Sequence, residues 1–192
     1  MASLRVLIAD DESIRLLSLG EQLAGLGHQV VAEATRGDEA VRLAEQHKPD
    51  LAILDIKMPV MDGIEAAERI TAARPIPIIL LTAYNETQLV ERAARANISA
   101  YLMKPVAEED LHPAIALALA RFKEFESLRR EVADLRDALE ARKVVEKAKG
   151  ILMRRLDLSE EDAFKRLQRQ SQDTNRRLAE VAEAIVMADR MF

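Results

Sequence analysis

Short apolar runs alternate with amphipathic stretches over the first 122 residues of the chain. Near-continuous apolar runs are typical of parallel strands that are buried on both faces, and the stretches between them carry apolar residues at helical spacing. The pattern predicts strands at 4–9, 30–32, 51–55, 76–81 and 99–103, and helices at 12–26, 37–47, 63–73, 85–96 and 107–122. Five such units predict an α/β fold, a doubly wound five-stranded parallel sheet with helices on both faces.

After residue 122 the spacing changes, and the rest of the chain is expected to be all-α. Apolar residues at 125, 128, 132, 135 and 139 fall at alternating three- and four-residue steps, which is a heptad seam. Residues 121–149 contain no Gly or Pro, so one long coiled-coil-type helix is expected, interrupted at Gly150. Ser159 and the acidic residues after it predict an N-cap, and helices are expected at 160–171 and 175–189. A partner helix is expected on the seam; docking onto the N-terminal domain is the alternative.

Composition and charge restrict the classes of function. The 192 residues suffice for one ordinary domain and a small second one, and the absence of cysteine excludes thiolate catalysis and zinc–thiolate sites. No apolar run approaches the roughly 18–20 residues of a membrane span, and the N-terminus leaves no room for a signal peptide. We therefore expect a cytoplasmic protein with no membrane contact. Residues 1–120 carry 11 Lys and Arg against 18 Asp and Glu, whereas residues 142–177 carry 11 against 6, which favours a polyanionic partner there.

Four of the apolar runs end on residues that can handle a phosphoryl group: Asp10 with Asp11, Asp55, Thr82 and Lys104. Because ligands bind outside the carboxyl ends of the strands in open α/β sheets, these side chains are expected at one edge of the sheet. Carboxylates are suitable ligands for Mg²⁺, and a carboxylate can also act as the nucleophile in phosphoryl transfer. Thr82 can donate a hydrogen bond to a phosphoryl oxygen, and Lys104 can pair with the same group.

This set of residues resembles the receiver domain of two-component response regulators. The motifs that carry the resemblance are Asp10-Asp11, Asp55 followed by Met58-Pro59-Val60-Met61-Asp62-Gly63, Thr82-Ala83 and Lys104-Pro105. The resemblance implies a flavodoxin-like receiver domain over residues 1–122, in which Asp55 accepts a phosphoryl group from a sensor histidine kinase.

The same resemblance implies roles for the other residues at the edge of the sheet. Mg²⁺ would be held by Asp11, Asp55 and the backbone carbonyl of Lys57, with Asp10 acting largely through water. Thr82 and Lys104 would assist the transfer, Thr82 and Tyr101 would form a conformational switch, and the Lys104–Pro105 peptide bond would be cis. A haloacid-dehalogenase-type phosphatase also uses an Asp nucleophile at a strand end, but it needs an acid at the position of Lys57, so an enzyme is not expected.

The C-terminal part resembles the ANTAR domain, an RNA-binding antiterminator module of three helices. The resemblance rests on Ala148-Lys149-Gly150-Ile151-Leu152-Met153, Glu161-Asp162-Ala163-Phe164, Leu167, Ser171, Asn175-Arg176-Arg177-Leu178-Ala179-Glu180-Val181-Ala182 and Ile185-Val186. We expect this domain at 130–192, sharing its first helix with a linker helix at 123–145. The expected RNA-binding residues are Arg154, Arg155, Lys165, Arg169, Gln172, Asn175, Arg176 and Arg177.

The two resemblances together predict a response regulator that binds RNA hairpins and regulates gene expression by transcription antitermination. Phosphorylation of Asp55 is expected to favour a homodimer joined through residues 122–145. One alternative is a DNA-binding transcription factor, although the Asp173-Thr174-Asn175 connection lacks the Gly that is usual in a helix-turn-helix. Another is a receiver that only binds proteins through its seam.

Overall fold

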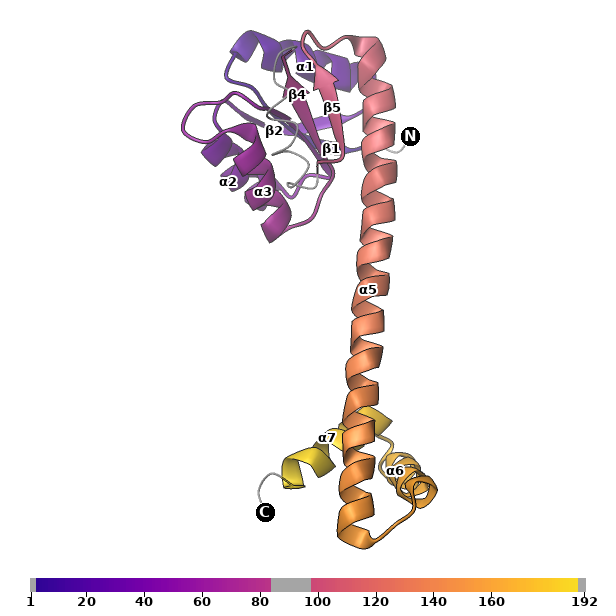
Figure 1. Cartoon of the computed structure of the whole chain (residues 1–192). Coiled ribbons are helices and arrows are strands. Elements are labelled where there is room, and N and C mark those ends of the chain that lie inside the picture. The colour runs from indigo at the N-terminus through magenta and orange to yellow at the C-terminus, as the bar shows by residue number, and fades with distance from the viewer. Residues whose placement is uncertain (1–2, 84–97, 190–192) are drawn as a thin grey trace. The chain divides into compact units, whose positions relative to one another are not determined.

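The computed structural model describes residues 3–83 and 98–189, and it divides into two compact units, Met1–Glu126 and Ser127–Phe192. The helix expected at 85–96 lies outside the described residues. Figure 1 shows the order of the elements along the chain. No described helix combines the length and the apolar character that a membrane span requires.

The first unit is built on a parallel sheet with the strand order β2-β1-β3-β4-β5, which is the order of a flavodoxin-like fold. Its elements are β1 (Arg5–Ala9), α1 (Ser13–Gly25), β2 (Gln29–Ala34), α2 (Gly37–His47), β3 (Leu51–Asp55), α3 (Gly63–Ala73), β4 (Ile78–Thr82) and β5 (Ala100–Met103), followed by the first turns of α5 (Glu108–Leu156). The predicted α/β fold class is therefore confirmed.

Two strands have a boundary that lies two residues from the sequence prediction, each for a local reason. β2 has six residues rather than three, because it is an edge strand whose exposed Gln29 and Glu33 interrupt the apolar run. β4 begins at Ile78 rather than at residue 76, after Pro77, which has no backbone N–H to donate to a strand ladder.

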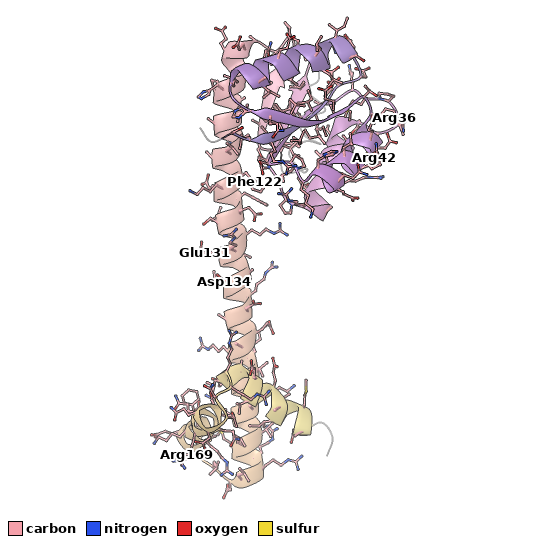
Figure 2. The ribbon with its side chains drawn as sticks, turned by 180° about the vertical axis from the view of Figure 1, so that it is seen from behind. Arg36, Arg42, Phe122, Glu131, Asp134 and Arg169 are labelled. Carbon is pink, nitrogen blue, oxygen red and sulfur yellow. The ribbon has the colours of Figure 1, made fainter. Side chains whose placement is uncertain are left out.

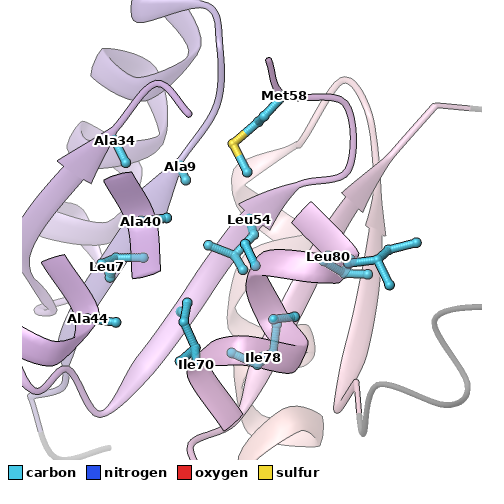
Figure 3. Close-up of a cluster of buried hydrophobic side chains, with 14 of the residues drawn as sticks. Leu7, Ala9, Ala34, Ala40, Ala44, Leu54, Met58, Ile70, Ile78 and Leu80 are labelled. Atoms are coloured by element: carbon cyan, nitrogen blue, oxygen red, sulfur yellow. The ribbon is translucent and has the colours of Figure 1, made fainter. Parts of the chain in front are cut away.

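Separate hydrophobic cores lie on the two faces of the sheet. The core between the sheet and helices α2 and α3 joins strand residues to helix residues and is seen in close-up in Figure 3, which labels Leu7, Leu54, Ile78, Leu80, Ala40, Ala44 and Ile70. On the opposite face, leucines of α1 and the residues Leu111, Ile115 and Ala118 of α5 pack against the sheet. Because both faces are covered, the central strands β1, β3 and β4 are buried almost completely, and functional groups must stand at the strand ends.

The second unit is all-helical, and its core joins the end of α5 to α6 (Glu160–Thr174) and α7 (Leu178–Asp189). The expected break at Gly150 is wrong, because α5 continues to Leu156. Ala148 is buried in this core, and Ile151, directly after Gly150, is buried as well. Their burial outweighs the roughly 1 kcal/mol by which Gly disfavours a helix. The helix instead ends before Asp157, whose φ of 52° is left-handed.

The connection between the last two helices also lies further along the chain than expected. α6 extends to Thr174 and is capped by Asn175 in the left-handed conformation, a conformation that Asn tolerates better than most residues. The backbone N–H groups of Asn175 and Arg176 donate to the carbonyl oxygens of Gln172 and Ser171 and so close the helix end. The N-cap predicted at Ser159 is confirmed, since its side chain accepts a hydrogen bond from the N–H of Asp162.

The heptad seam lies on the middle of α5, in the segment whose side chains are drawn around Glu131 and Asp134 in Figure 2. Its five apolar residues are all exposed in the single chain, with exposed fractions between 42% and 64%: Phe125, Leu128, Val132, Leu135 and Leu139. Isolated apolar residues are common on protein surfaces, but a row at heptad spacing is not explained by chance exposure.

Candidate functional site

The three predicted metal-binding carboxylates meet at the carboxyl edge of the sheet. β1 and β3 are neighbours in a register that pairs Ala9 with Leu54, so Asp10 and Asp55 come to lie side by side. Oxygen atoms of Asp10, Asp11 and Asp55 lie within 4.8 Å of one another. Asp10 and Asp55 are buried, whereas Asp11 is exposed. The sequence prediction that these residues come together is therefore met by the geometry.

Lys104 stands between the two buried carboxylates. Its Nζ atom lies 2.7 Å from Oδ2 of Asp10 and 2.7 Å from Oδ2 of Asp55. The backbone holds it there, because its N–H donates to the carbonyl oxygen of Thr82 at 2.8 Å and the Lys104–Pro105 peptide bond is cis, as the resemblance implies. The ammonium group of Lys104 thus forms ion pairs with both carboxylates.

The balance of charge at this edge remains negative. Burial raises the pKa of the Asp55 carboxyl, and the nearby Asp10 adds to this rise, although Lys104 and the backbone N–H of Lys57 oppose it. A raised pKa means that the ionised form of Asp55 is destabilised relative to an exposed carboxylate. A divalent cation with oxygen preference would relieve this destabilisation, so the donor set fits Mg²⁺.

The loop after β3 fixes the backbone beneath Asp55. Asp62 caps α3 by accepting a hydrogen bond from the N–H of Glu65 at 2.8 Å, and the N–H of Gly63 donates to the carbonyl oxygen of Ile56 at 2.9 Å. A Cβ atom at Gly63 would stand 2.0 Å from the backbone oxygen of Asp55. Only glycine therefore allows α3 to begin so close to the strand that carries the site.

The predicted switch residues occupy two neighbouring strands. Thr82 ends β4, is partly buried, and its Oγ1 donates to the carbonyl oxygen of Ala83 at 3.2 Å. Tyr101 lies on β5 and packs against the core that α2 and α3 cover. Burial raises the pKa of the Tyr101 hydroxyl, so this side chain is neutral at physiological pH.

Arg15 is part of this site, although the sequence patterns did not indicate it. Its Nη1 atom lies 3.5 Å from Oδ1 of Asp10, and its Nη2 atom lies 2.7 Å from Oε1 of Glu12. It also lines a cavity of about 150 Å³ next to Asp10 and Lys104. The only available signal was a cation on the first turn of the helix after Asp10, and a single cation on a helix surface does not by itself indicate a site. Asp10 is therefore held by two cations.

The residues expected to bind RNA are all exposed on the second unit, and Figure 2 labels Arg169 on α6. Three of the cations have acidic partners: Arg155 pairs with Asp189, Lys165 with Glu161, and Arg176 with Glu180. Within the described part of the chain, no ion pair involves Arg154, Arg169 or Arg177. The charge of these three cations is therefore not offset by an ion pair among the described residues.

Lys149 has a structural position, in contrast to those cations. It is buried, and its Nζ atom lies 2.9 Å from Oε1 of Glu146 and 2.7 Å from Oε1 of Glu160. The same atom lies 5.8 Å from the ring centre of Phe164. The Glu160 and Glu146 carboxylates raise the pKa of Lys149. This residue ties the end of α5 to the start of α6.

Comparison with protein families matches two models to the chain. Residues 6–116 match the response regulator receiver domain, and residues 133–186 match the ANTAR domain. Both are regulatory domains. The chain is 50% identical to the transcriptional regulatory protein PdtaR of Mycobacterium tuberculosis over 182 residues, which is 95% of this chain and 89% of that protein.

Solved structures resemble the first unit. The signal receiver domain of a modulated diguanylate cyclase from Desulfovibrio desulfuricans is 38% identical, with a TM-score of 0.59, covering 63% of this chain and 97% of that one. A CheX–CheY complex from Borrelia burgdorferi, solved with BeF₃ and Mg²⁺, is 27% identical, with a TM-score of 0.55, covering 58% of this chain and 85% of that one.

Proposed function

Because the chain belongs to the response regulators that combine a receiver domain with an ANTAR domain, we propose that it carries a phosphorylation signal from a sensor histidine kinase to RNA in the cytoplasm. Phosphorylated on Asp55, it binds RNA hairpins and regulates gene expression by antitermination. The domains proposed are a receiver at 1–122, a linker helix at 123–145 and an RNA-binding domain at 130–192. The observation that carries the proposal is the cluster of Asp10, Asp11 and Asp55, bridged by Lys104 at 2.7 Å.

The geometry supports Asp55 as the phosphoacceptor. A carboxylate oxygen of Asp55 attacks the phosphorus, a new P–O bond forms, and the P–N bond to the donor histidine breaks, which returns the electron pair to the imidazole nitrogen. Mg²⁺, held by Asp10, Asp11, Asp55 and the backbone carbonyl of Lys57, would supply charge neutralisation on the transferring group. Lys104 already contacts Asp55 and pairs with a phosphoryl oxygen after transfer.

The switch follows from the new charge on Asp55. A phosphoryl group adds acceptor oxygens beside Thr82, whose hydroxyl donates to the carbonyl oxygen of Ala83 at 3.2 Å. The hydroxyl turns to the phosphoryl group, and Tyr101 on the neighbouring strand moves into the space that Thr82 leaves. The surface of β5 and the start of α5 changes as a result, and this change favours the homodimer through residues 122–145.

The first experiment tests phosphorylation. The full chain is incubated with an acyl phosphate and Mg²⁺, and intact mass spectrometry measures the added phosphoryl group. Wild-type protein and the control Asp134→Asn, an exposed acid on α5, are expected to gain it, whereas Asp55→Asn is expected to gain none. Phosphorylation of Asp55→Asn to the wild-type level would overturn the assignment of the acceptor.

The second experiment tests the output. Binding of the phosphorylated chain to a pool of RNA hairpins is measured at increasing salt, with duplex DNA as competitor. We expect RNA binding that weakens steeply with salt, survives the competitor, and falls in Arg177→Gln but not in Arg42→Gln, an exposed cation of the receiver unit that Figure 2 labels. Preference for duplex DNA would favour a DNA-binding output, and no nucleic-acid binding at all would favour a protein-binding regulator.

A further inference from the structure

Both carboxylate oxygens of Asp10 have partners within the chain. Its Oδ2 atom lies 2.7 Å from Nζ of Lys104. Its Oδ1 atom accepts a hydrogen bond from the N–H of Glu12 at 3.0 Å and lies 3.5 Å from Nη1 of Arg15. Asp11, by contrast, is exposed and takes part in no ion pair among the described residues. A metal ion that enters this group of carboxylates must therefore compete with two cations for Asp10.

The guanidinium group of Arg15 bridges two acids, and its two contacts are unequal. Nη2 lies 2.7 Å from Oε1 of Glu12, the length of a good charge-assisted hydrogen bond, whereas Nη1 lies 3.5 Å from Oδ1 of Asp10. The contact with Glu12 joins positions i and i+3 where α1 begins, which is a favourable spacing for side chains on one helix. The contact with Asp10 is therefore the weaker one, and it breaks first when the charge around Asp10 changes.

Arg15 also has the space to move, whereas the second cation on Asp10 does not. The Arg15 side chain is 46% exposed and lines the cavity of about 150 Å³ next to Asp10. The Lys104 side chain is only 14% exposed, contacts Asp55 as well, and its backbone N–H is bonded to Thr82. Because Arg15 combines a long contact to Asp10, open space and a second acid, it is the cation that can leave Asp10.

We propose that Arg15 exchanges between Asp10 and Glu12, and that this exchange sets the affinity of the site for Mg²⁺. The inference rests on the Mg²⁺ site of the proposed function. The guanidinium group is repelled when a divalent cation stands beside Asp10, and Glu12 keeps it in an ion pair after it leaves. By linkage, Arg15 weakens Mg²⁺ binding by the same factor by which Mg²⁺ weakens the Arg15–Asp10 contact. Arg15 and Glu12 are thus positioning residues, which act on the metal through Asp10.

A double-mutant cycle tests the exchange, with the dissociation constant for Mg²⁺ measured by calorimetry on the full, unphosphorylated chain. Glu12→Gln leaves Arg15 with Asp10 alone and is expected to raise the dissociation constant roughly two- to fivefold, the range of an exposed ion pair. Arg15→Gln is expected to lower it by a similar factor. In the Arg15→Gln background, adding Glu12→Gln should change it by less than about twofold, because no guanidinium group remains to be redirected and a distant exposed charge is screened.

The chain offers a matched control pair on α2, where Glu39 and Arg42 form an ion pair with the same i,i+3 spacing at 3.6 Å. Glu39→Gln and Arg42→Gln should leave the dissociation constant for Mg²⁺ unchanged. Arg15→Lys keeps a cation beside Asp10 and should stay within about twofold of wild type. Urea unfolding of each variant shows whether its receiver unit is folded, so that a change in Mg²⁺ affinity is not confused with a loss of structure.

The NMR signals of the arginine Nε–H groups provide a second readout, which follows the side chain itself. The Arg15 signal, identified by its absence in Arg15→Gln, is expected to move as Mg²⁺ is added and to saturate at the dissociation constant found by calorimetry. The Arg42 signal is the internal control and should stay in place. An Arg15 signal that stays in place while calorimetry records Mg²⁺ binding would overturn the exchange.

The outcomes separate the exchange from the proposed metal site. A Glu12→Gln effect that disappears in the Arg15→Gln background supports the exchange. An equal Glu12→Gln effect with and without Arg15 shows that Glu12 acts only as a negative charge and overturns the exchange, while the Mg²⁺ site stands. A dissociation constant that Arg15→Gln does not change has the same consequence. Absence of Mg²⁺ binding in the wild-type chain overturns the metal site and the exchange together, and mass spectrometry of the phosphorylated chain still tests Asp55 separately.

Discussion

Replacing Gly63 by Ala is expected to destabilise the receiver unit and to disturb its site together. The new Cβ atom would stand 2.0 Å from the backbone oxygen of Asp55 and 2.8 Å from its carbonyl carbon. Contacts of Cβ below 3.0 Å essentially never occur, so the start of α3 must move by about 1 Å away from β3. Overpacking of this kind costs roughly 1–3 kcal/mol, and stretching the Gly63–Ile56 hydrogen bond adds about 1 kcal/mol.

The free energy of unfolding of the first unit is therefore expected to fall by roughly 2–4 kcal/mol, a large part of the 5–15 kcal/mol typical of a domain. Because the chain has two units, the measurement is a urea titration followed by hydrogen exchange of peptides from β1 and β3, which report the first unit alone. Displacement of Asp55 should also weaken Mg²⁺ binding in the same variant.

Gly150→Ala is the matched control, because its new Cβ would meet nothing nearer than a side-chain nitrogen of Arg154 at 3.7 Å. This position is inside α5, so Ala is expected to stabilise the second unit by about 0.5–1 kcal/mol. Replacing Gly by Ala is thus expected to lower the free energy of unfolding at position 63 and to raise it at position 150. Unchanged urea midpoints for Gly63→Ala would refute the argument that α3 packs directly against the backbone of Asp55.

Three further predictions concern the site and the long helix. In metal-free buffer, Asp55→Asn is expected to be more stable than wild type at neutral pH in urea unfolding, because the raised pKa of Asp55 makes wild-type stability fall as pH rises through that pKa. The difference in the free energy of unfolding should vanish below about pH 4, and a difference that is constant with pH would contradict this. Arg15→Gln removes a cation from Asp10 and should tighten Mg²⁺ binding a few-fold by calorimetry, against Arg42→Gln as control. In the unphosphorylated chain, amides of 125–139 should exchange faster than those of the buried ends of α5, and equal protection would contradict this.

The candidate site at the carboxyl edge of the sheet could be predicted because its residues directly follow apolar runs in the sequence. Asp55 ends β3 and Lys104 follows β5, so sequence order alone assigns them to one edge once the sheet is parallel. The sharing of Lys104 between Asp10 and Asp55 could not be predicted, since it depends on the neighbouring register of β1 and β3. Arg15 was missed because its contact to Asp10 depends on the rotation of α1.

The second unit was harder to predict from its sequence because its signals are local and weak. Gly150 predicts a helix end, but the burial of Ala148 and Ile151 overrides a local preference of about 1 kcal/mol. The basic residues expected to bind RNA are exposed, but the sequence does not show which of them form ion pairs with acidic residues. Arg155 finds its partner Asp189 in α7, 34 residues further along the chain, which no local pattern indicates.

The long helix α5 is stabilised unevenly, and this makes its middle the segment most sensitive to a partner. Its first turns bury Leu111 and Ile115 against the sheet. Its last turns bury Ala148 in the core of the second unit, and Ile151 is buried as well. Between them, residues 127–140 are exposed throughout, so this stretch has only its own backbone hydrogen bonds and side-chain pairs. Helices gain most of their stability in proteins from packing on an apolar face, and here that face is the seam. A second copy would therefore stabilise helix formation and association at once, because burying the seam supplies the packing that the single chain lacks. Small changes at the start of α5 could then decide between one copy and two.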